Sequence, residues 1–194
     1  LSDLCLKYKI VLIHISTDFV FDGRKGNYRE GSPTSPINYY GYSKKLGEDV
    51  LKKKLNKYII IRTSWLYSDY KNSFLNKIFE KIKKKEVLKV VNDQFGLPTS
   101  AYDLSNIVIL LIDRISKNYK IKFGLYHYSN FNSYSISWYD FAEKINFYVK
   151  KYHNKETTIK KISSKDINQI AKRPVDSSLN IDKICTTFNI KRKK

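Results

Sequence analysis

Thr17, Tyr40 and Lys44 are the residues of this chain whose types and spacing could carry out chemistry. Tyr40 and Lys44 are four residues apart, so on a helix their side chains share one face. The hydroxyl of a tyrosine has an ordinary pKa near 10, and a cation held close lowers that pKa because it favours the phenolate. Thr17 follows an apolar run and could hold a substrate oxygen beside Tyr40. The three residues predict proton donation to a carbonyl oxygen while a nicotinamide delivers hydride.

The Tyr–Lys spacing is a weak signal when it is taken alone. The chain has 16 Tyr and many lysines, and the same spacing recurs at Tyr67 and Lys71. Motif matches of this kind arise by chance. On spacing alone, an ordinary surface pair at Tyr40 and Lys44 remains the alternative. No glycine-rich loop of the kind that holds a cofactor diphosphate precedes the pair.

Apolar runs alternate with amphipathic stretches along the chain. The runs at 9–15 (KIVLIHI) and 58–62 (YIIIR) are short and rich in β-branched residues, as buried strands are. Further elements are expected as strands over 87–91 and 124–128 and near 159, and as helices over 35–57, 71–85, 100–116, 137–151 and 181–188. This alternation predicts an α/β fold with a mostly parallel sheet.

The sequence also predicts how the helices begin and which faces they bury. Ser35, Ser100 and Ser137 are the expected N-caps, because each precedes a helical pattern. Gly41 and Gly47 should allow a neighbouring segment to approach the helix over 35–57 closely. The apolar stripe expected to face inward from that helix comprises Leu46, Val50, Leu51 and Leu55.

The composition bears on which classes of partner the protein could have, but it does not indicate a function. The formal net charge of +19 would suit a nucleic-acid or anionic-membrane partner. The lysines are spread over helix faces, however, and no nucleic-acid-binding motif accompanies them, so solvated lysine faces are the favoured interpretation. No apolar stretch has the length of a membrane span. We therefore expect neither a nucleic acid nor a membrane as partner.

The cysteines and histidines predict neither a disulfide framework nor a metal site. Cys5 and Cys185 are far apart and form no Cys-x-x-Cys motif, which favours a reducing compartment such as the cytoplasm. His14, His127 and His153 share no metal-ligand spacing, so each is expected to be packed or exposed. We assign no metal ligand.

Several longer motifs carry a resemblance that covers nearly the whole chain. They are Ser16–Gly23 (STDFVFDG), Tyr40–Lys44 (YGYSK) with Gly47 and Glu48, Arg62–Tyr67 (RTSWLY), Val90–Thr99 (VVNDQFGLPT) and Arg173 with Pro174. Together they resemble the extended short-chain dehydrogenase/reductase family. The RTSWLY and VVNDQFGLPT segments narrow the resemblance to the dTDP-4-dehydrorhamnose reductases.

The resemblance implies a fold, a reaction and a set of partners. The fold is α/β, a Rossmann-like mostly parallel sheet with a small C-terminal α/β substrate lobe. Residues 1–120 would be the C-terminal part of the dinucleotide-binding domain, with 69–99 partly contributing to the substrate lobe, and 121–194 would mainly form that lobe. The reaction is reduction of the 4-keto group of dTDP-4-dehydro-L-rhamnose with NADPH or NADH, a step in making sugar for cell-surface polysaccharide. Family members can be homodimers.

The resemblance also implies roles for individual residues. Tyr40 would be the proton donor, Lys44 would tune it and bind the nicotinamide ribose, and Thr17 would polarise the keto oxygen. Thr17 and Asp18 would contact the sugar nucleotide. The one local departure is Phe19, where the family usually has Tyr.

Two further residues are implied as substrate-binding, each with a structural alternative. Trp65 would lie against the bound nucleotide, or it is an aromatic residue of the core. Arg173 would approach the diphosphate, or it serves only to shape its loop.

Family members begin with strands and a glycine-rich turn that hold the cofactor, whereas this chain opens on Leu1 and contains no Met. We therefore expect a fragment whose sheet lacks its N-terminal strands; an unusual start codon or processing is the alternative. We expect the 194 residues alone to bind NADPH weakly or not at all. A non-catalytic regulatory relative, similar to the β subunit of methionine adenosyltransferase, is the second functional hypothesis.

Overall fold

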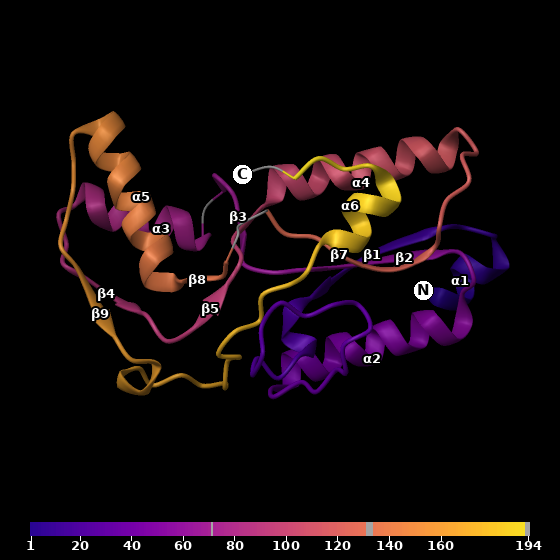
Figure 1. Ribbon diagram of the computed structural model, residues 1–194, viewed down its shortest axis with the longest axis horizontal. Helices are drawn as coiled ribbons and strands as arrows, with labels where there is room; N and C mark the ends of the chain where they lie inside the picture. Colours follow the sequence, from indigo (N-terminus) through magenta and orange to yellow (C-terminus); the bar gives the residue numbers. More distant parts are fainter. Residues whose placement is uncertain (71, 131–133, 193–194) are drawn as a thin grey trace.

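The computed structural model describes residues 1–70, 72–130 and 134–192. Figure 1 shows a main sheet with helices above and below it and, on the left, a smaller lobe built around α3, α5, β4 and β9. The helices are α1 (Ser2–Lys7), α2 (Tyr39–Lys54), α3 (Phe74–Lys83), α4 (Ala101–Ser116), α5 (Trp138–His153) and α6 (Asp182–Phe188), with short 3-10 turns η1 (Asp18–Val20) and η2 (Ser164–Asp166).

The main sheet contains three parallel strands in the order β1-β2-β7. They are β1 (Leu12–Thr17), β2 (Tyr58–Thr63) and β7 (Gly124–His127). The register pairs Thr17 with Thr63 and Arg62 with His127, so polar residues of all three strands meet at their carboxyl ends. This is the edge at which open α/β sheets bind ligands.

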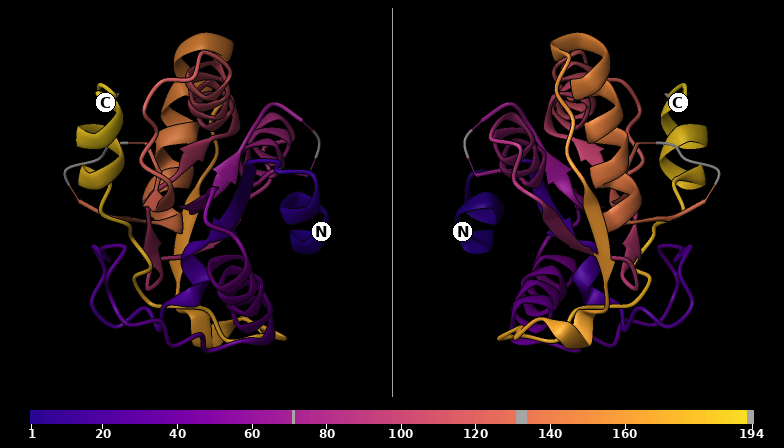
Figure 2. Two further views of the ribbon diagram at one scale, coloured as in Figure 1. Left: turned by 90° about the vertical axis from the view of Figure 1, so that its right-hand side faces the viewer. Right: turned by 90° about the vertical axis from the view of Figure 1, so that its left-hand side faces the viewer.

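Successive side chains of β2 pack against different helices on the two faces of the main sheet. Ile60 packs against Leu51 of α2 and Leu55 at the C-cap of that helix, whereas Ile59 and Ile61 pack in a cluster with α4 and α6. Successive strand residues point to opposite faces, which accounts for this division. In Figure 2, α2 (purple) and α6 (yellow) accordingly lie on opposite sides of the molecule. Both faces of the strand are covered, as its continuous apolar run predicted.

The smaller lobe packs two helices on a parallel strand pair. Strands β4 (Leu88–Val91) and β9 (Ile159–Ile162) form the pair, and α3 and α5 lie against it. Two short ladders connect the lobe to the main sheet, namely β3 (Leu66–Tyr67) with β6 (Thr99–Ser100), and β5 (Phe95–Gly96) with β8 (Ile136–Ser137). The predicted α/β fold with a mainly parallel sheet is confirmed.

The helix starts at Ser100 and Ser137 are confirmed, and the start at Ser35 is wrong. The side chains of Ser100 and Ser137 accept hydrogen bonds from the third residue of their helices, and Ser137 forms a full capping box with Asp140. Helix α2 begins later, at Tyr39, because the side chain of Asn38 accepts from the Gly41 N–H at 2.8 Å. The helix predicted from Lys71 begins at Phe74, and Lys71 itself lies outside the described residues.

The inward face of α2 differs from the predicted leucine stripe. Leu51 and Leu55 are buried, but Leu46 and Val50 are each 46 % exposed. The residues of α2 that are buried are Gly41, Glu48 and Leu51. A buried charged residue therefore sits at the centre of this face, which rotates the helix away from the orientation that apolar residues alone predict.

One of the two glycines in α2 is needed for close packing. A Cβ atom at Gly41 would lie 2.1 Å from the Phe19 carbonyl oxygen, whereas one at Gly47 would meet nothing within 4 Å. The expectation of a close approach is confirmed at Gly41 and wrong at Gly47. The chain after β1 thus runs directly over the first turn of α2.

The domain boundary expected at residue 120 stays a prediction. The packing crosses it, because β7 pairs with β2 and α6 joins the core cluster of α4. The smaller lobe draws its helices and strands from two stretches, 74–91 and 138–162. Within the described part of the chain, no helix is both long enough and apolar enough to span a bilayer.

Candidate active site

The carboxyl end of β1 and the first turns of α2 bring four of the predicted site residues into one region. Lys44 Nζ donates to the Ile15 carbonyl oxygen at 2.7 Å, so the second turn of α2 lies against the end of β1. The Tyr40 ring meets the Phe19 ring edge to face, with centroids 5.8 Å apart. Thr17 and Asp18 lie in the chain between Ile15, which Lys44 contacts, and Phe19, which Tyr40 contacts. Tyr40, Lys44, Thr17 and Asp18 are thereby neighbours, although their predicted roles stay predictions.

The four residues differ sharply in exposure. Tyr40 is 54 % exposed, whereas Thr17 and Asp18 are only 5 % and 3 % exposed. The ring of Phe19 contributes an apolar contact and no hydroxyl at this place. The accessible acid–base group of the region is therefore the Tyr40 side chain, with buried polar groups beneath it.

Asp18 is held by neutral donors in a buried position. Its carboxylate accepts from the Thr17 hydroxyl at 3.0 Å and from the Ser177 hydroxyl. Burial raises the pKa of Asp18 to about 6, and the hydrogen bonds from Ser177 and Thr17 oppose that rise only in part. Ser177 lies far along the chain, so Asp18 also fixes the C-terminal segment to the end of β1.

A buried ion pair that sequence reasoning missed lies beside this region. Glu48 of α2 accepts from Arg62 of β2 through both carboxylate oxygens, at 2.8 and 2.6 Å, and from the Ser16 hydroxyl at 2.6 Å. Burial by itself raises the pKa of Glu48, but the hydrogen bonds and charge of Arg62 outweigh it and leave the pKa lowered. The available signal was the position of Glu48, one turn after Lys44 on the same helix face.

His127 of β7 completes the buried cluster as a neutral side chain. Desolvation, followed by the charge of Arg62, lowers the pKa of His127 to about 3. Its Nδ1 lies 3.0 Å from the Tyr28 carbonyl oxygen and its Nε2 lies 3.4 Å from Arg62 Nη1. Because a carbonyl oxygen only accepts and a guanidinium only donates, Nδ1 carries the hydrogen. The expectation of a packed histidine is confirmed here.

Trp65 forms part of an aromatic stack in the smaller lobe. Its ring lies parallel to that of Trp138, with centroids 3.5 Å apart, and a Cβ atom at Gly96 would meet the ring at 2.6 Å. The backbone of Trp65 has φ +44, a left-handed conformation that side-chain-bearing residues adopt rarely. The packing agrees with the core alternative, and the predicted contact with a nucleotide stays a prediction.

Arg173 lines a large cleft between the smaller lobe and the loop that follows β9. The cleft has a volume of about 970 Å³, and Phe74, Gln94 and Trp138 are among its lining residues. Its cationic lining residues are Lys77, Lys81, Lys89 and Arg173. The neighbouring Lys172 carbonyl oxygen accepts from the Asn38 side chain at 2.9 Å. This contact places the cleft next to the N-terminus of α2 and hence next to Tyr40.

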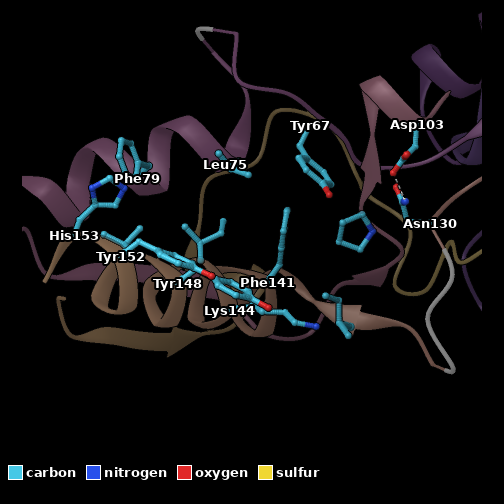
Figure 3. A pocket seen from close by; sticks show the side chains of 14 residues that line it. Tyr67, Leu75, Phe79, Asp103, Asn130, Phe141, Lys144, Tyr148, Tyr152 and His153 are labelled. Atoms are coloured by element: carbon cyan, nitrogen blue, oxygen red, sulfur yellow. Dashed lines mark hydrogen bonds between the residues drawn. The ribbon is translucent and has the colours of Figure 1, made fainter. Parts of the chain in front are cut away.

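A second cavity lies elsewhere in the lobe and contains none of the predicted site residues. It measures about 590 Å³ and is lined mainly by aromatic and aliphatic side chains of α3 and α5. Figure 3 shows Phe79 and Leu75 on one side of it and Tyr148 and Tyr152 on the other, with the Asp103–Asn130 hydrogen bond at one end. Among the described residues, no group of three or more His, Cys, Asp or Glu could hold a metal ion.

Comparisons with known proteins identify the family of the chain. The family model described as the RmlD substrate binding domain matches residues 1–194. The chain belongs to this family. It is 35 % identical to the dTDP-4-dehydrorhamnose reductase of Aggregatibacter actinomycetemcomitans over 193 residues, which are 98 % of this chain and 65 % of the relative. It is 34 % identical to the Escherichia coli K12 reductase over 91 % of this chain and 59 % of that relative.

Solved structures extend the same likeness. The dTDP-4-dehydrorhamnose reductase from Bacillus anthracis, in complex with NADP, has a TM-score of 0.85 and 34 % identity, covering 98 % of this chain and 64 % of that one. The ortholog from Clostridium acetobutylicum has a TM-score of 0.84 and 33 % identity, covering 99 % and 65 %. The resemblance inferred from the motifs is confirmed. The chain spans less than two thirds of the length of these relatives.

Proposed function

We propose that the whole protein is a reductase that uses NADPH or NADH to convert the 4-keto group of dTDP-4-dehydro-L-rhamnose to the alcohol of dTDP-L-rhamnose. The observation that carries the proposal is the contact of Lys44 Nζ with the Ile15 carbonyl oxygen. It sets the helix of Tyr40 against the strand that ends at Thr17. The names of the relatives that match over nearly the whole chain support the same reaction.

Each residue of the set has a role that its chemistry and position permit. Tyr40 is exposed and can donate its hydroxyl proton to the keto oxygen of a bound sugar. Lys44 has three N–H donors, of which the Ile15 carbonyl takes one, so two remain for the Tyr40 hydroxyl and a ribose hydroxyl. Thr17 would polarise the keto oxygen from the strand side once its hydroxyl hydrogen, which Asp18 accepts in this structure, is released.

The donors that Lys44 retains fit a nicotinamide nucleotide beside Tyr40. When bound, the dihydronicotinamide supplies the hydride, and the chain's own residues supply the proton and the orientation. The expectation of weak NADPH binding by the 194 residues alone stays a prediction. Isothermal titration checks it, and micromolar or tighter affinity of the isolated chain for NADPH would contradict it.

The basic cleft beside α2 suits the nucleotide part of the substrate. Its lysines and Arg173 provide the positive charge that a diphosphate requires, and the planar guanidinium can bind phosphate oxygens in a bidentate manner. Trp138 lines the cleft and carries Trp65 stacked on it, so an aromatic surface for a base is available. Asp18 accepts from the Thr17 and Ser177 hydroxyls and so supports Thr17, and its predicted contact with the sugar nucleotide stays a prediction.

Three further features belong to the proposal. A place in cell-surface polysaccharide synthesis is supported by a match to a spore coat polysaccharide biosynthesis protein, SpsK of Bacillus subtilis, 36 % identical over 169 residues. A cytoplasmic location is supported by two buried free cysteines, Cys5 and Cys185. A homodimer is proposed by family resemblance alone. No observation favours the regulatory alternative, since the matched relatives are named for catalysis or biosynthesis.

The direct test is oxidation of NADPH by the whole protein with dTDP-4-dehydro-L-rhamnose as substrate. Tyr40→Phe removes the proposed proton donor and should lower kcat by a factor on the order of 100 or more. Tyr42→Phe is the matched control, because Tyr42 lies on the same helix and is 50 % exposed. Equal kcat values for the two variants, or no turnover by the unaltered protein, would refute the assignment.

A further inference from the structure

The hydroxyl of Thr17 has its only hydrogen in use. Thr17 Oγ1 donates to Asp18 Oδ1 at 3.0 Å and accepts from the Phe19 N–H at 3.2 Å. A hydroxyl carries one hydrogen, so in this arrangement Thr17 can accept one more bond but cannot donate one. A keto oxygen needs a donor. Thr17 can therefore polarise a substrate carbonyl only if Asp18 first releases the Thr17 hydrogen.

Asp18 is enclosed by groups that could let it hold a proton. It is 3 % exposed, and its second oxygen, Oδ2, accepts from the Ser177 hydroxyl. Both hydroxyls can turn, because the hydrogen of a hydroxyl rotates to suit its partners. The pKa of Asp18, which burial raises to about 6, agrees with a carboxyl that changes state close to neutral pH. Its buried neighbour Glu48 differs, because Arg62 keeps it ionised.

The charged and ionisable groups around Asp18 are engaged elsewhere. On α2, which packs against η1, Lys44 donates to Ile15 O. On β2, Arg62 is paired with Glu48. In the C-terminal segment, Asp176 accepts from the Ser135 hydroxyl and the Ser178 N–H. The side-chain partners of Asp18 are thus the neutral hydroxyls of Thr17 and Ser177. The protonation state of the Asp18 carboxyl is therefore what can change among these three side chains.

We propose that Asp18 is a positioning residue that controls the direction of the Thr17 hydroxyl. As a carboxylate, Asp18 accepts the Thr17 hydrogen and keeps it from the substrate. As a carboxylic acid, Asp18 donates from Oδ1 to Thr17 Oγ1 while Oδ2 continues to accept from Ser177, and the Thr17 hydrogen turns to the keto oxygen. The inference rests on the proposed function, since it needs a keto sugar beside Thr17 and Tyr40.

The consequence is a reductase whose carbonyl polarisation depends on pH. Removal of one donor to a developing oxyanion costs about 100-fold to 1000-fold in kcat where it has been measured. Rising pH should withdraw the Thr17 donor gradually, so kcat should fall about 20-fold to 30-fold between pH 5 and pH 7.5 as Asp18, with its pKa of about 6, ionises. A role in which Asp18 only fastens the Ser177 segment to β1 predicts no such dependence.

The first experiment follows the Asp18 carboxyl carbon by ¹³C NMR titration of the 194-residue chain, with Asp18→Asn for assignment. Thr17→Val removes a donor that favours the ionised form, so the Asp18 midpoint should move to higher pH. Thr63→Val is the matched control, because Thr63 pairs with Thr17 across the strands and its buried hydroxyl has no hydrogen-bond partner among the described residues. An unmoved midpoint in Thr17→Val overturns the proposal whatever the activity.

The second experiment measures kcat of the whole protein between pH 5 and pH 7.5. Asp18→Asn should make kcat independent of pH over this range, at a level between the two limits of the unaltered protein. Asp22→Asn is the control, since Asp22 lies in the same loop and accepts from the Tyr28 hydroxyl outside the site. An active Asp18→Asn variant that keeps the original pH profile overturns the proposal. If no variant turns over the keto sugar, the proposed function fails, while the titration still decides whether Asp18 and Thr17 are coupled.

Discussion

Glu48 of α2 and Arg62 of β2 form a bidentate ion pair whose side chains are 0 % and 1 % exposed. The Ser16 hydroxyl joins the same carboxylate, so α2 is fastened to both β1 and β2 at one point. Lys44 lies one turn before Glu48, and Thr17 follows Ser16. The pair therefore sets the position of the proposed catalytic residues from a buried place behind them.

Breaking this pair from one side should strongly destabilise the fold. Arg62→Met leaves the buried Glu48 carboxylate with only the Ser16 hydroxyl and the partly exposed Lys52 ammonium as partners. Loss of one partner of a buried ion pair costs roughly 3–5 kcal/mol in comparable cases. Urea denaturation of the chain measures the loss. The double variant Glu48→Met with Arg62→Met removes both charges, so it should be more stable than Arg62→Met alone.

An exposed ion pair provides the control for this prediction. Asp113 in the last turn of α4 and Lys117 at its C-cap form one, with side chains about half exposed. Asp113→Asn should change the free energy of unfolding by less than about 1 kcal/mol. A loss in Arg62→Met no larger than that of Asp113→Asn would show that the buried pair does not hold α2 in place.

The two glycines of α2 should respond oppositely to alanine. Gly41→Ala places a methyl group against the Phe19 carbonyl oxygen, so either the backbone after β1 or the first turn of α2 must move, at a cost of about 1–3 kcal/mol. Gly47→Ala meets empty space and should stabilise the helix by about 0.5–1 kcal/mol. Thermal unfolding of the two variants tests both signs, and equal shifts of Tm would contradict the packing described at Gly41.

The success of the sequence analysis depended on whether a feature was local. Strand β2 and the caps at Ser100 and Ser137 are determined by patterns of a few consecutive residues, and the sequence predicts them correctly. The orientation of α2 is not predicted correctly, because it depends on the ion pair between Glu48 of α2 and Arg62 of β2. No local sequence pattern indicates that these two residues pair. An apolar stripe is a sound guide to a helix face only where no buried charge competes for the same face.

The same limit applies to the site. The motif around Tyr40 and Lys44 identified the region, since spacing on one helix is local. The second partner of the Asp18 carboxylate could not be predicted, because Ser177, whose hydroxyl donates to it, lies 159 residues from Asp18 in sequence. The function of Thr17 therefore required the folded arrangement.

His127 should make stability rise with pH. Its pKa is lowered to about 3 in the fold, so between pH 3 and about 6.5 the unfolded chain binds the proton and the folded chain does not. This contribution to stability is complete above about pH 6.5 and is lost as the pH falls. His127→Asn keeps a donor for the Tyr28 carbonyl oxygen but cannot titrate. Urea denaturation between pH 4.5 and 6 should show its slope of stability against pH reduced by up to about 1.4 kcal/mol per pH unit.

Asp18 should act in the opposite direction over the same range. Its pKa is raised to about 6, so between about pH 4 and pH 6 the folded chain holds a proton that the unfolded chain has released. This contribution is complete below the unfolded pKa and is lost as the pH rises through about 6. Asp18→Asn should therefore steepen the rise of stability with pH, whereas His127→Asn flattens it. If the slope of stability against pH changed with the same sign in both variants, then either the pKa of Asp18 would not be raised or that of His127 would not be lowered in the fold.

Arg173 should contribute to nucleotide affinity through the basic cleft. Hydrogen bonds to charged groups contribute about 1.5–3 kcal/mol, so Arg173→Ala should weaken dTDP binding by roughly 10-fold to 100-fold. The substitution leaves the adjacent Lys172 carbonyl, which accepts from Asn38, in place, so the loop should keep its anchor to α2. Lys53→Ala is the charge-matched control, because Lys53 is an exposed residue in the last turn of α2 and is not among the residues that line the cleft. Isothermal titration of the chain with dTDP compares the two. A loss shared equally by both variants would mean that net charge alone attracts the nucleotide, and it would remove Arg173 from the substrate site.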